Sequence, residues 1–219
     1  MARKTKAEAA LTRHRIVESA RQVFSRAGVT NTSLEEVAQE AGVTRGAVYW
    51  HFRNKADLFR AVRADTGTLL RLGPPGSGDA LRRLETTLLE AVRRLRGDAA
   101  ARQTYEVMLW KCEYVDELAP VRTELMKAGG AFASELRELY AQAAAQGLTE
   151  PGLDPRLSAL ETLCLYAGMV KLWLADTGAG GVTGSRRRRW ATWCRIMAST
   201  WGRSISPPVS ASQSFTIPA

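Results

Sequence analysis

The stretch "VTRGAVYWHF" (residues 43–52) decides how the first part of this chain folds. Tyr49, Trp50 and His51 are consecutive, and a helix spreads three consecutive side chains around most of its circumference, so one core cannot hold them all. Val48 and the phenylalanine one turn later form an apolar face instead. The pattern predicts a short helix that buries its aliphatic side and presents aromatic rings to something outside the fold.

Helices are also predicted on both sides of this stretch. Apolar residues recur at spacings of three and four from about Lys6 to Ala27, which indicates an amphipathic helix. Ser33 with Glu36 three positions later is typical of a capping box, and Thr44 can cap the next helix. A fourth helix begins near Asn54. Two short helices joined by a tight glycine-containing turn are typical of a helix-turn-helix.

The segment "LGPPGSGD" (residues 72–79) breaks the helical pattern and is the predicted domain boundary. The first domain covers residues 1–70 with a basic arm at 1–9, the second covers 80–204, and the polar tail 205–219 is expected to be disordered. No run alternates long enough to predict a strand. The expected fold class is all-α, with a three-helix helix-turn-helix domain followed by a larger helical bundle. Helices of the second domain are expected over about 80–95, 100–115, 121–146, 155–176 and 185–203.

Composition narrows the class of protein. A formal net charge of +9 favours a polyanionic partner without choosing between nucleic acid, an anionic membrane and simple solubility. Cys112, Cys164 and Cys194 are scattered and form no CxxC pair, which argues against a disulfide framework or a zinc site and fits a reducing cytoplasm. The N-terminus lacks the apolar run of a signal peptide, and charged residues interrupt the apolar run 157–175, so no membrane span is expected.

The exposed side of the third helix carries groups that suit DNA. Arg45 can pair with a guanine edge or a phosphate, and Tyr49 and His51 offer donors to the sugar-phosphate backbone. Gly46 and Ala47 have little side chain, which allows the helix backbone to approach the bases. The third helix is therefore predicted to read DNA.

Phosphate contacts are expected around this helix. Ser33 and Lys55, at the starts of the second and fourth helices, would hold phosphates at helix N-termini. Arg3, Lys4 and Lys6 in the arm would add contacts that do not depend on sequence. Trp50 fits a packing wedge between the third helix and its neighbours better than a base contact, because large aromatic side chains usually serve packing.

The segment "TSLEEVAQEAGVTRGAVYWHFRNKADLF", preceded by "IVESARQVFSRAG", resembles the DNA-binding domain of the TetR family of bacterial transcriptional regulators. "MARKTKAEA" and "WKCEYVDELAPVR" further resemble the multidrug-efflux repressors of the AcrR type. The resemblance implies a repressor of a resistance-nodulation-division pump operon that leaves DNA when a drug-like molecule binds. The alternatives are a regulator of a metabolic or biosynthetic cluster, and an activator. The resemblance places the DNA contacts, with Trp50 beside them, at Ser33, Thr44, Arg45, Gly46, Ala47, Tyr49, His51 and Lys55.

The second domain offers candidates for a ligand pocket. Soft and aromatic side chains adapt to varied apolar ligands, although at helical spacing they belong to a core more often than to a pocket. Glu106 and Glu113 lie on or beside an apolar face and would suit a cationic drug. The candidate pocket residues are Glu106, Met108, Trp110, Glu113, Tyr114, Tyr166, Met169 and Trp173.

The last two expected helices are predicted to form a homodimer interface, because they are apolar around more of their circumference than one core contact requires. The TetR family pairs these helices with their two-fold mates. A two-fold dimer would read an inverted repeat in double-stranded DNA whose half-sites lie roughly 34 to 36 Å apart. The candidate interface residues are Leu160, Ala167, Leu174, Trp190, Trp193, Met197 and Trp201.

Two other classes of protein fit less well. The only histidines are His14 and His51, and the chain has no GxSxG, no HExxH and no glycine-rich phosphate loop after a strand, so no catalytic residues, metal ligands or cofactor are expected. A basic protein lying on an anionic membrane would need a strongly amphipathic exposed helix, whereas the apolar stripes here are interpreted as mutually buried.

Overall fold

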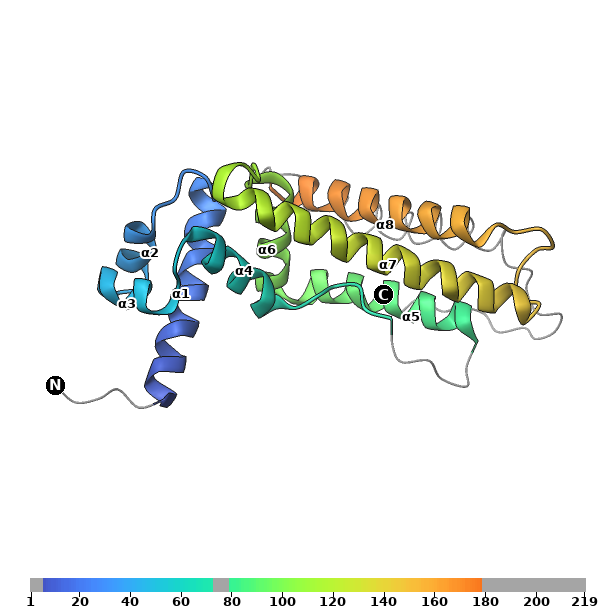
Figure 1. Cartoon of the computed structure of the whole chain (residues 1–219), viewed down its shortest axis with the longest axis horizontal. Coiled ribbons are helices and arrows are strands. Elements are labelled where there is room, and N and C mark those ends of the chain that lie inside the picture. Colours follow the sequence, from blue (N-terminus) through green and yellow to red (C-terminus); the bar gives the residue numbers. More distant parts are fainter. Residues whose placement is uncertain (1–5, 73–78, 179–219) are drawn as a thin grey trace.

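The computed structural model describes residues 6–72 and 79–178, and every regular element in these ranges is helical, which confirms the expected all-α class. A small head at the N-terminal end joins an elongated bundle (Figure 1). The elements are α1 (Lys6–Ala27), α2 (Leu34–Glu40), α3 (Arg45–His51), α4 (Lys55–Thr66), α5 (Ala80–Gly97), α6 (Ala99–Trp110), η1 (Asp116–Leu118), α7 (Ala119–Ala145) and α8 (Pro155–Gly178).

Local sequence signals set the helix ends in the head. The capping box at α2 is present: Glu36 N donates to Ser33 Oγ over 3.2 Å, and Ser33 N donates to Glu36 Oε2 over 2.6 Å. Thr44 Oγ1 accepts from Ala47 N at the start of α3. These bonds satisfy amides that have no partner inside their helices, so both short helices begin where the sequence predicts.

Glycines end α1 and α4. Gly28 follows α1 with φ +82°, and a Cβ there would lie 3.4 Å from the carbonyl oxygen of Lys111. Gly67 follows α4 with φ +63°. Residues with a Cβ rarely adopt a positive φ of this size, so glycine suits the position where each helix ends. The fourth helix is therefore short, and it points its C-terminal end at the bundle (Figure 1).

The core of the head includes residues from far along the chain. Phe24 and Phe59 meet edge to face, with ring centroids 6.0 Å apart, between α1 and α4. Val107, Leu118 and Val121 belong to the same buried cluster, although they come from α6, η1 and α7. The predicted domain boundary at residues 72–79 therefore does not coincide with the boundary between the two cores.

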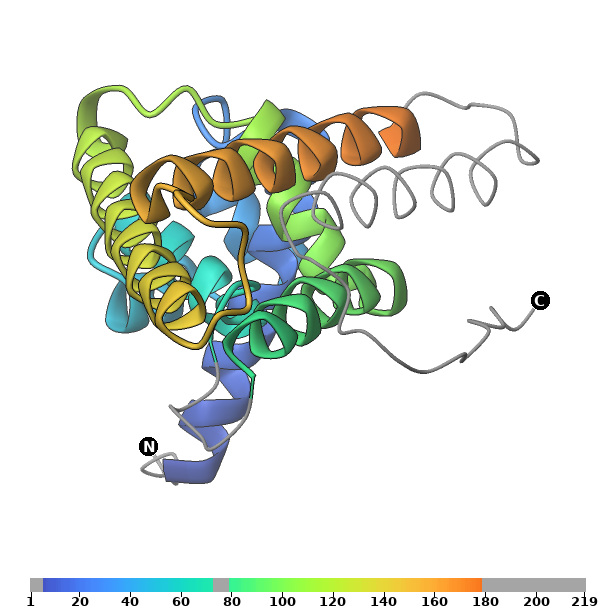
Figure 2. The same ribbon diagram turned by 90° about the vertical axis from the view of Figure 1, so that its right-hand side faces the viewer.

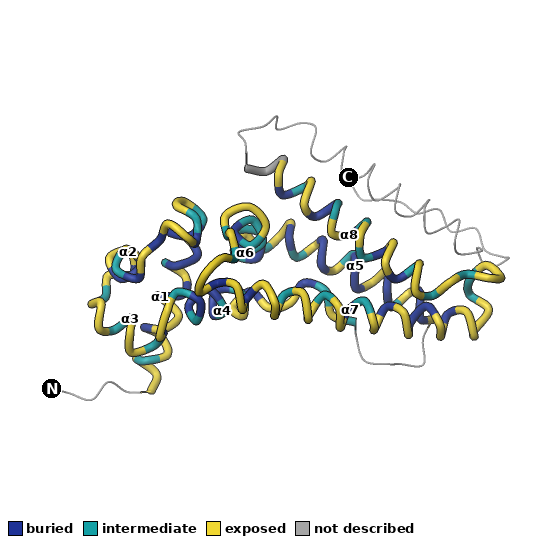
Figure 3. Tube along the Cα trace, turned by 45° about the horizontal axis from the view of Figure 1, so that its top comes forward, coloured by how far each residue is buried: buried dark blue, intermediate teal, exposed yellow. Residues whose placement is uncertain are grey.

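The bundle core lies between α5, α7 and α8, which surround it when viewed end-on (Figure 2). Buried and exposed residues alternate along these helices as their periodicity requires (Figure 3). A buried hydrogen bond of 2.7 Å joins Tyr140 Oη on α7 to Thr162 Oγ1 on α8. The fully buried side chains of the bundle include Leu88, Leu136 and Leu174.

Two expectations about where helices begin and end need correction, and two others fall outside the described residues. The helix expected over 100–115 ends at Trp110, because the chain then bonds to the head: Val29 N donates to Lys111 O over 2.8 Å, and Lys111 Nζ donates to Ser25 O. The arm expected over 1–9 is already helical from Lys6. The helix expected over 185–203 and the tail 205–219 lie outside the described residues.

The segment 155–175 of α8 is long and apolar enough to cross a membrane by length and composition alone. About 33% of its most apolar part is buried inside the protein. Core helices of soluble proteins pass the same test, and α8 packs along α7 in the bundle. We therefore interpret α8 as a bundle helix.

Candidate nucleic-acid interface and ligand cavity

The exposed side of α3 carries the aromatic residues that the sequence singled out. Val48 is completely buried, whereas Tyr49 is 43% exposed and Trp50 is 72% exposed. Trp50 meets His51 edge to face at 4.4 Å between ring centroids. The expectation that Trp50 is a packing wedge is wrong, because Val48 and Phe52 already fill the space beneath the helix.

Arg45 is held in place on this surface. Its Nε lies 2.7 Å from Glu35 Oε1 on α2, and its guanidinium stacks over the Tyr49 ring at 5.3 Å from the centroid. The hydrogen bond with Tyr49 and the charge of Glu35 both raise the pKa of Arg45. Glu35 orients this arginine, and sequence spacing alone did not indicate the pairing. The exposed glycine and the half-buried alanine that follow Arg45 leave the start of α3 without bulky side chains.

Lys55 has a different immediate role from the one expected. Its Nζ donates to Thr30 O over 2.7 Å and to Thr32 O over 3.0 Å, so it ties the first turn of α4 to the loop before α2. The exposed N-cap Ser33 lies next to that loop. In this arrangement, Lys55 fixes the positions of two neighbouring helix N-termini.

Two arginines of α1, the exposed Arg15 and the buried Arg21, bond to α2 and α4. Arg15 donates to Ala41 O over 2.8 Å at the C-terminal end of α2, where a cation is favourable. Arg21 has a side chain that is only 4% exposed and donates to Asp65 near the end of α4. These contacts hold in place the helices on which α3 packs.

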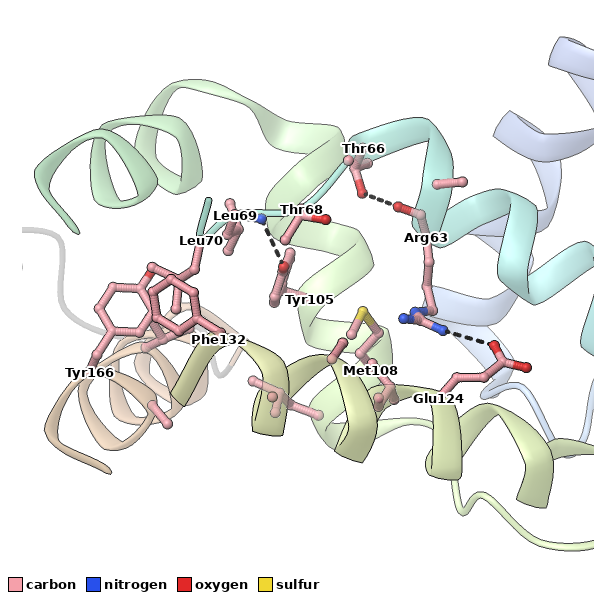
Figure 4. A pocket seen from close by; sticks show the side chains of 18 of the residues that line it. Arg63, Thr66, Thr68, Leu69, Leu70, Tyr105, Met108, Glu124, Phe132 and Tyr166 are labelled. Carbon is pink, nitrogen blue, oxygen red and sulfur yellow. Dashed lines mark hydrogen bonds and ion pairs between the residues drawn. The ribbon is translucent and has the colours of Figure 1, made fainter. Parts of the chain in front are cut away.

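A cavity of about 700 Å³ lies where the end of α4 meets α6, α7 and α8 (Figure 4). Its lining is mostly apolar, with a charged group at the α4 end. Its lining residues include Arg60, Arg63, Leu70, Tyr105, Met108, Glu124, Phe132 and Tyr166. Cavities of this size hold drug-sized molecules.

Two of the eight expected pocket residues, Met108 and Tyr166, line this cavity. Tyr114 instead packs against Phe59 at 6.2 Å between centroids and donates to Met108 O over 2.9 Å, because α6 ends before it. Met169 is buried in the bundle core and Trp173 packs against it. The remaining three, Glu106, Trp110 and Glu113, do not line the cavity, and the last two are exposed.

The carboxylate of the cavity is Glu124 on α7. Arg60 NH2 lies 2.9 Å from Glu124 Oε1, and Arg63 NH1 lies 4.0 Å from Glu124 Oε2. The hydrogen bond from Arg60 lowers the pKa of Glu124, which is therefore ionised at neutral pH. Glu106 and Glu113, the two acids expected to suit a cationic drug, do not line the cavity.

Tyrosine hydroxyls line the inner part of the cavity. Tyr105 Oη accepts from Leu69 N over 3.3 Å. Tyr166 Oη is buried and has no hydrogen-bond partner within residues 6–72 and 79–178. Burial raises the pKa of Tyr166, so its hydroxyl stays protonated and able to donate.

Only part of the expected dimer interface lies within the described residues. Leu160 and Ala167 are exposed on α8, together with Leu157 and Leu172. Leu174 is 1% exposed and belongs to the bundle core, so its assignment to an interface is wrong. Trp190, Trp193, Met197 and Trp201 lie outside the described residues.

The part of the chain that the structure describes contains no group of three His, Cys, Asp or Glu side chains that could hold a metal ion. Cys112 and Cys164 are free thiols. Burial raises the pKa of the Cys112 thiol, which makes it a poor nucleophile at neutral pH.

The chain is similar to known bacterial regulators along most of its length. Residues 16–62 match the family described as "Bacterial regulatory proteins, tetR family". The HTH-type transcriptional regulator TtgR of Pseudomonas putida is 33% identical over 179 residues, which cover 80% of this chain and 85% of TtgR. The HTH-type transcriptional regulator AcrR of Shigella flexneri is 42% identical over 127 residues, 56% of this chain and 59% of AcrR.

A solved structure agrees with these matches. The crystal structure of NalD, the secondary repressor of the MexAB-OprM multidrug efflux pump in Pseudomonas aeruginosa, is 30% identical, with a TM-score of 0.71 over 92% of this chain and 99% of NalD. The helix-turn-helix geometry of α2 and α3 and these similarities agree. This chain belongs to the TetR family of bacterial transcriptional regulators.

Proposed function

We propose that this protein is a cytoplasmic, homodimeric repressor that binds an inverted-repeat operator and leaves it when an apolar small molecule binds. Control of a multidrug efflux operon is its proposed cellular role, supported by the likeness to NalD. The observation that carries the proposal is the exposed face of α3, where Arg45, Tyr49 and Trp50 stand clear of the core.

Recognition of DNA follows from the chemistry of this face. Arg45 would read a guanine edge, as arginines do in the major groove. Tyr49 and His51 would bond to phosphate or sugar oxygens. Ser33 and Thr44 cap α2 and α3 and are exposed, so the N-termini of both helices would face the DNA backbone. Contacts by Gly46, Ala47, Trp50 and Lys55 complete the proposed interface.

Release by a small molecule is supported by the place of the cavity. Its walls include the last turns of α4, the helix that follows α3 in the chain. A ligand lowers operator affinity only if it binds more tightly to a conformation that fits DNA poorly, and couplings of about 1 to 3 kcal/mol are typical. Met108 and Tyr166 would contact the apolar part of the ligand.

Pairing of two copies is supported by the apolar side of α8. Leu157, Leu160 and Leu172 are each more than half exposed along this helix. Burying such a stripe against a two-fold mate would remove it from water. The two reading helices would then face successive turns of one duplex.

The test is operator binding by fluorescence anisotropy, with labelled inverted-repeat DNA from the protein's own promoter. Arg45→Ala should weaken binding about tenfold or more and relax the preference for one base pair, and Tyr49→Ala should weaken binding severalfold on all sequences. Arg137→Ala, which removes an exposed arginine from α7, is the matched control and should bind normally. If both α3 variants bind as the control does, α3 does not read DNA.

A further inference from the structure

The cavity indicates which chemical class of effector it binds. We propose that it takes an apolar molecule carrying one acidic group, such as a carboxylate, and that this group takes Arg63 and Arg60 away from Glu124. This inference rests on the cavity being the effector site of the proposed repressor.

The charges of the cavity favour an anion. Among its described lining residues, the charged side chains are Arg60, Arg63 and Glu124, which together carry one net positive charge. The carboxylate is already engaged by both arginines. A cationic ligand would therefore meet two arginines and no free carboxylate, whereas an anionic ligand would meet two cations that share one partner.

Arg63 has hydrogen-bonding capacity to spare. Its Nε is buried without a hydrogen-bond partner among the described residues, and the 4.0 Å from its NH1 to Glu124 exceeds hydrogen-bonding distance. Arg60, in contrast, also bonds to Asp57 over 3.2 Å. A buried donor without a partner is unfavourable, so a carboxylate that bonds to Arg63 would satisfy a group that the free protein leaves unsatisfied.

The remainder of the cavity suits an apolar body. Figure 4 shows Arg63 and Glu124 at one end, Phe132 and Tyr166 at the other, and Met108 between them. Aromatic and thioether side chains adapt to ligands of varied shape. The unpartnered hydroxyl of Tyr166 can donate to an acceptor on the apolar part of the ligand, which gives the site a second polar contact.

The same arginines join α4 to the bundle. Both lie on α4 and Glu124 lies on α7, and the pairing continues from Arg60 through Asp57 to Arg53, just after the reading helix. Binding of an acid would exchange an ion pair between helices for one between α4 and the ligand. The effector would thereby loosen the contact that holds α4 in its present position.

The first experiment compares three probes of one shape: para-hexylbenzoate, para-hexylbenzamide and para-hexylbenzylammonium. Each is titrated calorimetrically into the full-length protein without DNA, near neutral pH. The benzoate should bind about tenfold more tightly than either of the others, the range expected for a charge-assisted hydrogen bond. Arg63→Met and Arg63→Gln should each abolish this preference and leave benzamide binding within about twofold. Arg137→Met, outside the cavity, should keep the preference.

The second experiment separates the ion pair from the ligand. Glu124→Gln removes the competing carboxylate, so the benzoate should bind about threefold more tightly while operator binding weakens. Glu138→Gln, an exposed carboxylate on the same helix, should change neither. The inference is overturned if the ammonium probe binds as tightly as the benzoate, if the preference survives both Arg63 variants, or if no probe binds. Because the titrations contain no DNA, the measured affinities for the three probes do not depend on whether the protein binds its operator.

Discussion

Replacing Asp65 with asparagine tests how firmly the head is held together. The Arg21 side chain is 4% exposed, donates to Asp65 Oδ2, and its Nε has no hydrogen-bond partner among the described residues. Asparagine keeps the shape and one acceptor oxygen but leaves the buried guanidinium without its main countercharge. Because this contact joins α1 to the last turn of α4, its loss should also loosen the head.

The size of the effect follows from exposure. Breaking a fully buried ion pair by removing one partner costs about 3 to 5 kcal/mol. The Asp65 side chain is 31% exposed and partly screened, so we expect a lower value, about 2 kcal/mol. For a chain of this length, about 2 kcal/mol corresponds to a fall in Tm of roughly 4 to 8 °C.

Urea denaturation followed by circular dichroism measures this loss, at one fixed protein concentration because the proposed dimer would gain stability with concentration. Glu18→Gln is the matched control, since Glu18 lies 3.8 Å from the same Arg21 and its side chain is half exposed. Removing it should cost less than about 0.5 kcal/mol. If Asp65→Asn is no more destabilising than Glu18→Gln, the Arg21–Asp65 pair does not stabilise the head.

Two further predictions concern the helix caps at the starts of α2 and α3. Thr44→Ala removes the acceptor for the first turn of α3 and should lower the free energy of unfolding, measured in urea, by about 1 kcal/mol. Thr44→Ser keeps the hydroxyl and should be nearly as stable as the original protein. Equal stability of all three proteins would contradict the capping role. Hydrogen bonds from the Ser33 backbone amide and hydroxyl lower the pKa of Glu36. The ionised Glu36 therefore contributes fully to the free energy of unfolding above its unfolded pKa of about 4.3, and this contribution is lost as pH falls through its lower folded pKa. Acid denaturation should show this loss, and Glu36→Gln should remove that part of the pH dependence; an identical acid profile in the variant would show that the carboxylate contributes nothing.

Local signals in the sequence were enough to predict the head. Caps act over three residues and amphipathic stripes over one or two turns, so Ser33, Thr44 and the burial of Val48 follow from short stretches. The orientation of side chains without such a signal was harder to predict. Trp50 was misjudged because the general tendency of large aromatic side chains to pack was given more weight than its place opposite Val48 on the helix.

The cavity could not be predicted in the same way, because it depends on contacts between distant residues. Glu124 pairs with Arg60 across 64 positions, and no helical period brings the two together. The end of α6 at Trp110 is set by a bond from Val29 to Lys111 and by no glycine or proline nearby. The prediction of a helix that continues to residue 115 placed Glu113 and Tyr114 on a helical face, but the helix ends before both residues.

The shared core of the head limits how this regulator can be recombined with its relatives. Val107, Leu118 and Val121 complete the packing around α1 and α4, although they follow the loop near residue 72 by more than thirty positions. A chimera spliced at that loop would combine the head of one protein with the packing residues of another at these three positions. Gaps or clashes would result in the core of the head. Hybrid sensors built on this scaffold should therefore transplant those three positions together with residues 6–72.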